Sequence, residues 1–173
     1  TPNYELLDLL KKEKKKDLFE ELNYLYKKLI DSHIIFITQP KPIGFGDAIE
    51  FSKKFIKDEK FLLHAGDDIV ISKNNSHLVR LEKSFKKYNA DIACLIEEVV
   101  DPSQYGVIRG NLLENGIIDI KEINEKPKKP KSNKAIIAIY IFKPKIFEYL
   151  SQVKNKTTPQ NQLSKAFELA VKN

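Results

Sequence analysis

The sequence lacks methionine, has one cysteine and two arginines, and contains no long apolar run. Cys94 cannot form an internal disulfide, and its apolar surroundings, DIACLIEE, predict a buried core thiol of a cytoplasmic protein. No segment is long enough in apolar residues to span a membrane, and no secretory n-region and h-region open the chain. Since a complete gene product begins with Met and this chain begins Thr1-Pro2-Asn3, we expect a piece of a longer, or a processed, polypeptide.

The positive charge of the chain is almost entirely lysine. The net charge is +6, yet Arg80 and Arg109 are the only arginines. Nucleic-acid readers favour arginine forks, and here lysines alternate with glutamates as on a solvated surface, so no nucleic-acid partner is predicted. A phosphate-rich small molecule fits a modest positive balance better. The length of 173 residues suits one domain with a real core.

The most informative stretch is FLLHAGDDIVI, residues 61–71. Its continuous apolar start predicts a strand buried on both faces of a parallel sheet, with His64 as a core histidine. Gly66 then lets the chain turn, and Asp67 and Asp68 follow at the carboxyl end of the strand, where α/β sheets bind ligands. Two hard carboxylates suit Mg²⁺ and a phosphate, although a simple polar turn would have the same residues. The histidines and Cys94 have no zinc-ligand spacing.

A glycine loop lies between a predicted strand over 33–39 and a predicted helix that runs to about residue 55. The loop reads QPKPIGFGDA from Gln39 to Ala48. A strand followed by Gly44-x-Gly46 and the start of a helix would present backbone N–H groups to an anion or a base edge. The alternative is that the two glycines only make a tight connection between the strand and the helix. The Gln39 amide, a donor and an acceptor together, can pair with the imide edge of a pyrimidine.

The rest of the chain completes an α/β pattern. Leucine spacing predicts two helices within residues 4–29, separated by the lysine-rich segment 11–16, which is an exposed helix end or loop. A helix over 74–88 and a strand over 91–100 complete β-α-β-α-β, hence a Rossmann-like, mainly parallel sheet with helices on both faces and right-handed crossovers. A small antiparallel appendage with an Asn115-Gly116 hairpin turn is expected next. A strand over 135–142 and helices over 144–153 and 159–171 follow, all in a single domain over 1–173.

Five motifs in order resemble one family. The loop QPKPIGFGDA, the GDD strand, Tyr105-Gly106-Val107, Glu125-Lys126-Pro127 and Ser132-Asn133-x-Ala135-Ile136 keep its order and approximate spacing over about residues 34–150. The chain resembles the bacterial-type UTP–glucose-1-phosphate uridylyltransferases (UDP-glucose pyrophosphorylases), which are sugar nucleotidyltransferases. The resemblance implies the nucleotide-diphospho-sugar transferase fold. By itself, Glu125-Lys126-Pro127 reads as an exposed strand end.

The resemblance also implies roles for matching residues. Catalysis is implied for Asp67, as the Mg²⁺ ligand, and for Lys126, which would bind the sugar-1-phosphate. The nucleotide would be bound by Gln39, Gly44, Gly46 and Asp68. The sugar side would consist of Gly106, Glu125, Ser132 and Asn133. The implied cytoplasmic reaction is Mg²⁺-dependent transfer of a uridylyl group from UTP to glucose-1-phosphate, which gives UDP-glucose and pyrophosphate. The resemblance is compatible with a homo-oligomer.

Departures from the family pattern set the alternatives. The family's N-terminal glycine-rich phosphate loop and its second metal-binding Asp have no counterpart in these residues, and two acidic positions of the family are lost within 159–166. We therefore expect a central fragment that turns over poorly or not at all by itself. The alternatives are another sugar-1-phosphate nucleotidyltransferase such as a thymidylyltransferase, a glycosyltransferase of related fold, and a non-catalytic nucleotide-sugar-binding homologue.

Overall fold

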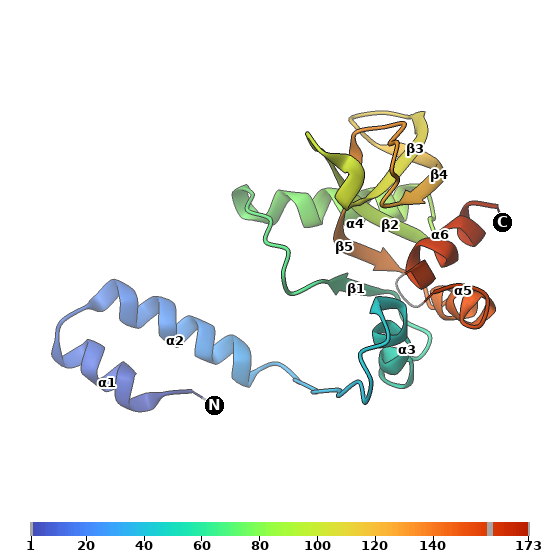
Figure 1. Ribbon diagram of the computed structural model, residues 1–173. Coiled ribbons are helices and arrows are strands. Elements are labelled where there is room, and N and C mark those ends of the chain that lie inside the picture. Colours follow the sequence, from blue (N-terminus) through green and yellow to red (C-terminus); the bar gives the residue numbers. More distant parts are fainter. Residues whose placement is uncertain (1, 159–160, 173) are drawn as a thin grey trace. The chain divides into compact units, whose positions relative to one another are not determined.

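Two compact units make up the protein, residues 1–38 and residues 39–173. The structure is a computed structural model that describes residues 2–158 and 161–172 (Figure 1). The first unit contains two helices, and the second contains a sheet with helices packed on it. All the candidate site residues lie in the second unit.

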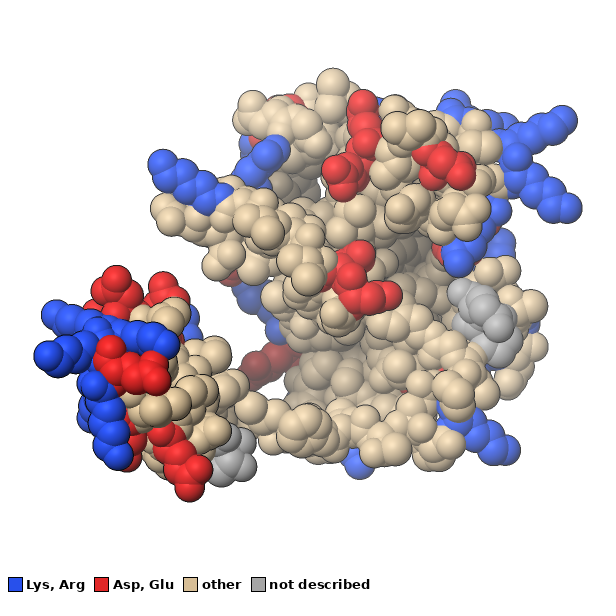
Figure 2. Space-filling view, turned by 60° about the vertical axis from the view of Figure 1, so that its left-hand side comes forward, with Lys and Arg blue, Asp and Glu red and all other residues tan. Residues whose placement is uncertain are grey.

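The first unit consists of α1 (Tyr4–Lys12) and α2 (Lys16–Ile30), as the leucine spacing predicted. The Asn3 side chain accepts a hydrogen bond from the Leu6 N–H at 3.0 Å and so caps the start of α1. Lysine and acidic side chains lie side by side on this unit (Figure 2), with ion pairs such as Lys16 to Glu20. The lysine-rich segment between the helices is therefore an exposed turn with mixed charge around it.

Residues 33–38 form no strand, so the predicted strand over 33–39 is wrong. The segment is exposed, and Phe36 is 93% exposed. A strand needs a neighbour for its backbone N–H and C=O groups, and no other described segment pairs with this one. Its β-branched residues favour an extended backbone but cannot supply that neighbour.

A five-stranded sheet organises the second unit. Its strands are β1 (Phe61–His64), β2 (Ile92–Glu98), β3 (Gly106–Leu112), β4 (Ile118–Glu125) and β5 (Lys134–Phe142). β5 is central: β1 and β2 pair with its two edges, β3 pairs with its beginning, and β4 pairs with β3. Every one of these pairings is antiparallel, so the prediction of a mainly parallel sheet is wrong.

The error has a topological cause. β1, α4 (Ser76–Lys87) and β2 do form a crossover, because both strands run antiparallel to β5 and hence in the same direction. Leu63 of β1 and Cys94 of β2 both pair with Tyr140, so β5 lies between them. The intervening strand comes about forty residues later in the chain, and no local sequence pattern predicts its position between β1 and β2.

The antiparallel appendage is the β3–β4 hairpin, and its prediction is confirmed. Asn115 and Gly116 both have positive φ, 49° and 75°, as a type I′ turn requires. Gly110 lies at a bulge in β3, where an added Cβ would come within 2.1 Å of the Asp119 carbonyl oxygen. Only glycine allows the two backbones to approach this closely.

Helices cover both faces of β5, as predicted. On one face Leu81 and Phe85 of α4 pack with Ile139 and Ile141. On the other, Tyr140 and Phe142 pack with α3 (Phe45–Ile56), α5 (Ile146–Val153) and α6 (Gln162–Lys172). Full burial of a side chain such as Phe142 contributes roughly 1.5–3 kcal/mol. Two short 3₁₀ turns, Lys73–Asn75 and Pro102–Gln104, complete the described elements.

Two predicted burials need correction. β1 alternates between half-buried and exposed residues, and Leu62 is 51% exposed, so the strand is not buried on both faces. His64 is exposed, with Nε2 2.7 Å from the Asp68 carbonyl oxygen, and is no core histidine. Cys94 is half-buried against the core, and burial raises the pKa of its thiol to about 12.

None of the helices in the described part of the chain has the length and apolar character needed to cross a membrane.

Candidate functional site

The glycine loop is ordered around the Gln39 amide. Gln39 Nε2 donates to Asp47 Oδ2 at 2.6 Å and to the Gly44 carbonyl oxygen at 3.3 Å. Asp47 is buried in the first turn of α3, and its Oδ1 lies 3.8 Å from Lys154 Nζ. Gln39 Oε1 accepts no hydrogen bond from any residue that the structure describes. The amide is thus held by its nitrogen and presents an unused acceptor.

The two positions of this loop that contain glycine require it for different structural reasons. Gly44 has φ 136°, a backbone conformation that favours glycine, and it precedes α3, whose first N–H groups have no partner within the helix. Gly46 is buried, and a Cβ there would lie 2.8 Å from Gln162 Cβ and 3.1 Å from Leu150 Cδ2. Gly46 therefore allows α3 to pack closely on α5 and α6.

The Gly-Asp-Asp turn gives its two carboxylates different surroundings. Asp68 Oδ2 accepts a hydrogen bond from the Ala138 N–H at 2.8 Å, which joins the turn to β5. The Asp67 side chain is exposed and has no hydrogen bond or ion pair within residues 2–158 and 161–172. A metal ligand needs free oxygen lone pairs, so Asp67 fits the predicted role better than its neighbour.

The donors for a metal are few. Among the described residues there is no group of three or more His, Cys, Asp and Glu side chains that could hold an ion. Mg²⁺ usually takes one or two protein carboxylates and completes its shell with phosphate and water. Asp67, with Asp68 beside it, supplies that number.

The predicted sugar side forms where β3 begins and β4 ends. Gly106 pairs with Glu125, and Glu125 Oε2 lies 3.1 Å from where a Gly106 Cβ would be. Ser164 Oγ, in the first turn of α6, donates to Glu125 Oε2 at 2.5 Å. Lys126 follows with φ 41°, its N–H donates to the Tyr105 carbonyl oxygen at 3.0 Å, and its side chain is exposed.

Ser132 and Asn133 lead into β5 beside this point. Ser132 Oγ accepts a hydrogen bond from the Lys134 N–H at 3.1 Å, and the Asn133 carbonyl oxygen accepts one from the Val99 N–H at 2.9 Å. Ala135 pairs with Val107, the residue after Gly106. The two residues are thus brought to the same end of the sheet as Gly106, with their backbone held in place.

Sequence reasoning gave no role to Tyr140, which is buried on β5. Burial raises the pKa of its phenol, and the negative charge of the Glu125 and Asp68 carboxylates raises that pKa further. Asp47 and Ser164 were missed as well, because their partners lie 8 and 39 residues away in sequence. Of the divergent segment 159–166, residues 159 and 160 lie outside the described residues.

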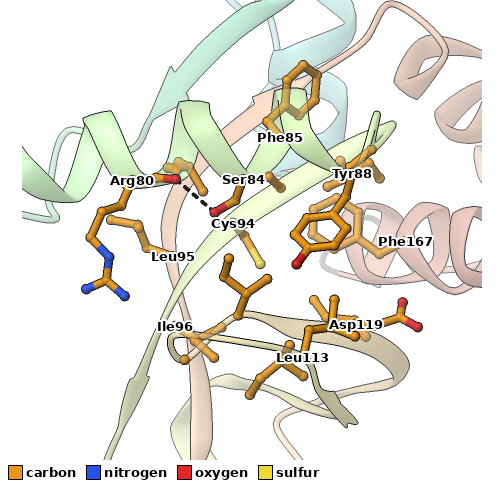
Figure 3. A pocket seen from close by; sticks show the side chains of 18 of the residues that line it. Arg80, Ser84, Phe85, Tyr88, Cys94, Leu95, Ile96, Leu113, Asp119 and Phe167 are labelled. Carbon is orange, nitrogen blue, oxygen red and sulfur yellow. Dashed lines mark hydrogen bonds between the residues drawn. The ribbon is translucent and has the colours of Figure 1, made fainter.

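A cavity in the described part of the chain lies away from the candidate site residues. A pocket of about 1020 Å³ lies between α4, β2, β4 and α6 and is lined mostly by apolar side chains such as Leu95, Cys94 and Phe167 (Figure 3). No candidate site residue lines it. The Cys94 thiol in this pocket stays protonated at neutral pH, and Asp91 is paired with Lys143 and Lys145, so neither residue is available as a nucleophile or base.

A family model of nucleotidyl transferases matches residues 5–173. The chain belongs to the nucleotidyl transferase family. It is 34% identical over 149 residues to the UTP–glucose-1-phosphate uridylyltransferase of Mycoplasma genitalium, which covers 82% of this chain and 50% of that protein. The predicted resemblance is thus confirmed.

Solved structures agree with this assignment. This nucleotidyl transferase superposes on apo UDP-glucose pyrophosphorylase with a TM-score of 0.85 and 31% identity, over 100% of this chain and 64% of that chain. A UDP-glucose pyrophosphorylase complexed with UDP-glucose has a TM-score of 0.78 and 33% identity, over 89% of this chain and 61% of that chain. The chain spans about half the length of the curated relatives it matches.

Proposed function

We propose that this nucleotidyl transferase is the substrate-holding part of a UTP–glucose-1-phosphate uridylyltransferase. The observation that carries the proposal is that the central strand β5 holds both carboxylate sides: its Ala138 N–H donates to Asp68, and its Ala135 pairs with Val107, next to the Gly106–Glu125 pair. A phosphate–metal side and a hydroxyl-binding side attached to one strand suit a nucleotide joined to a sugar. A relative of the same fold was solved with UDP-glucose bound, which supports the sugar nucleotide as ligand.

The chemistry requires positioning more than acid–base catalysis. Glucose-1-phosphate is already an anion, so its oxygen can attack the α-phosphorus of UTP without a strong general base, and pyrophosphate leaves. Such transfers depend on alignment and charge neutralisation. Asp67, with Asp68 in support, would hold Mg²⁺, which when bound neutralises charge at the α-phosphate.

The other residues would hold the two substrates. Lys126 extends an exposed cation toward the sugar phosphate from a backbone fixed by Tyr105. Glu125, beside Gly106, accepts hydrogen bonds from sugar hydroxyls, with Ser132 and Asn133 nearby. Gln39 offers Oε1 to the N3–H of uracil, and its weaker 3.3 Å bond to Gly44 can be exchanged for one to a uracil carbonyl.

The cellular setting follows from the substrates. UTP and a sugar phosphate are cytoplasmic metabolites, and the single free thiol, Cys94, is compatible with a reducing compartment. We therefore place the reaction in the cytoplasm.

The test is pyrophosphate release by the full gene product from UTP plus glucose-1-phosphate, with and without Mg²⁺. We expect release that depends on the ion, and faster release with UTP than with dTTP. Faster release with dTTP would show a thymidylyltransferase. Binding of UDP-glucose without any pyrophosphate release would show a non-catalytic homologue, and release of UDP from UDP-glucose would show a glycosyltransferase.

A further inference from the structure

The first turn of α6 touches both sides of the candidate site. Gln162 packs against Gly46 of the nucleotide loop, with its Oε1 3.1 Å from where a Gly46 Cβ would be. Two residues later, Ser164 Oγ donates to Glu125 Oε2 at 2.5 Å. One rigid helical turn is therefore attached both to the nucleotide loop and to the carboxylate of the sugar side.

The two oxygens of Glu125 differ because of this contact. Oε2 is occupied by Ser164 and lies against Gly106. Oε1 accepts no hydrogen bond from the residues in the described ranges. The carboxylate is anchored by one oxygen and has the other free for a ligand hydroxyl, which is the arrangement that makes a hydrogen-bonding group directional.

We propose that Ser164 is a positioning residue, which orients Glu125 so that Oε1 receives a sugar hydroxyl. The inference rests on the proposed function, since Glu125 acts on the sugar only if a sugar nucleotide is the ligand. A serine on a helix suits the task because its donor is short and its backbone is fixed by the helix. Lys165, the next residue, does not compete for Glu125, because its Nζ pairs with Glu168 at 2.7 Å.

The inference predicts a loss that depends on the ligand. A ligand with a glucosyl group uses Glu125, whereas UDP alone does not reach it. Removal of the Ser164 hydroxyl should therefore weaken UDP-glucose binding selectively. If the bond merely attached α6 to β4, its loss would disturb the nucleotide loop through Gln162 as well, and both ligands would bind less tightly.

The experiment is calorimetric titration of the full-length protein with UDP-glucose and with UDP. We expect Ser164→Ala to weaken UDP-glucose binding about tenfold and to leave UDP binding within about twofold of wild type, the scale of one hydrogen bond to a charged group. Ser164→Thr, which keeps the hydroxyl, should restore UDP-glucose binding. Glu125→Gln should weaken UDP-glucose binding, and adding Ser164→Ala to it should cost little more, because the two residues act as one unit.

Ser84→Ala is the matched control, because Ser84 Oγ donates only to the Arg80 carbonyl oxygen in α4, on the other face of the sheet. Equal weakening of both ligands by Ser164→Ala, or no weakening of either, would overturn the positioning role while the proposed function stands. Wild-type protein that binds UDP but not UDP-glucose would overturn the proposed function and this inference together.

Discussion

The two sides of the candidate site use carboxylates in different ways. At the Gly-Asp-Asp turn one residue is the anchor and its neighbour is free: Asp68 accepts the Ala138 N–H, and Asp67 is exposed. On the predicted sugar side a single residue does both, because Glu125 is held through Oε2, while its Oε1 accepts no hydrogen bond from the residues that the structure describes. Residue type alone therefore does not separate a carboxylate engaged in the fold from one available to a ligand; the occupied oxygens do.

Asp67→Asn should give the largest effect on activity, and it tests the exposed carboxylate of the Gly-Asp-Asp turn. If Asp67 is the metal ligand, pyrophosphate release should fall at least about a hundredfold, the range expected for the loss of a key electrostatic group. The free energy of unfolding, measured with urea in the absence of ligand, should stay within about 0.5 kcal/mol of wild type, because the exposed Asp67 side chain has no hydrogen bond or ion pair with the residues that the structure describes. A large loss of stability with retained activity would reverse the roles of the two aspartates.

Asp68→Ala should show the opposite pattern. It leaves the Ala138 N–H without its acceptor at a partly buried position, which costs about 1–3 kcal/mol of unfolding free energy. Urea denaturation without ligand measures this loss. Asp68→Asn keeps an acceptor oxygen and is the control; if both variants unfold alike, the hydrogen bond to β5 does not stabilise the turn.

Gly46→Ala tests whether the nucleotide loop needs glycine for packing. The added Cβ would meet Gln162 Cβ at 2.8 Å, so the variant should lose about 1–2 kcal/mol in spite of the better helix propensity of alanine. Gly66→Ala is the matched control because no atom lies within 4 Å of its added Cβ. Urea denaturation of the two variants side by side should separate them, and equal stability would argue against close packing of α3 on α6.

Both carboxylate oxygens of Asp91 are paired with lysines. Its substitution is expected to have the smallest effect on stability. Burial raises the pKa of Asp91, but its hydrogen bonds to Lys145 at 2.8 Å and Lys143 at 3.2 Å lower it more, so the net pKa is below the ordinary 3.8. Since the folded pKa is below the unfolded one, this stabilisation is present above the ordinary pKa and is lost as the pH falls through the folded pKa.

Asp91→Asn should therefore flatten the dependence of unfolding free energy on pH below about pH 4. Chemical denaturation at a series of pH values measures the slope. An unchanged slope in Asp91→Asn would show that the pairing of Asp91 with Lys143 and Lys145 does not stabilise the fold.

Local patterns in the sequence predicted most of the elements and supplied the residues of the candidate site. The leucine spacing of α1 and α2, the Asn115-Gly116 turn, and the Asp67-Asp68 pair after β1 depend on residues within a few positions of one another. Backbone preference and side-chain periodicity act at that range, so the sequence alone is sufficient for them. The family motifs needed only their order along the chain.

Only the tertiary structure decided the strand order and the separate roles of the carboxylates. The placement of β5 between β1 and β2 joins distant segments of the chain, and the hydrogen bond from Ala138 to Asp68 joins residues 70 positions apart. The hydrogen bond between Ser164 and Glu125 also joins segments that are distant in sequence. Residues 33–38 show the opposite case, because this strand-like segment has no partner strand in the described chain. Pairing is a property of two segments, and the pattern of one segment carries no record of which other segment will lie beside it.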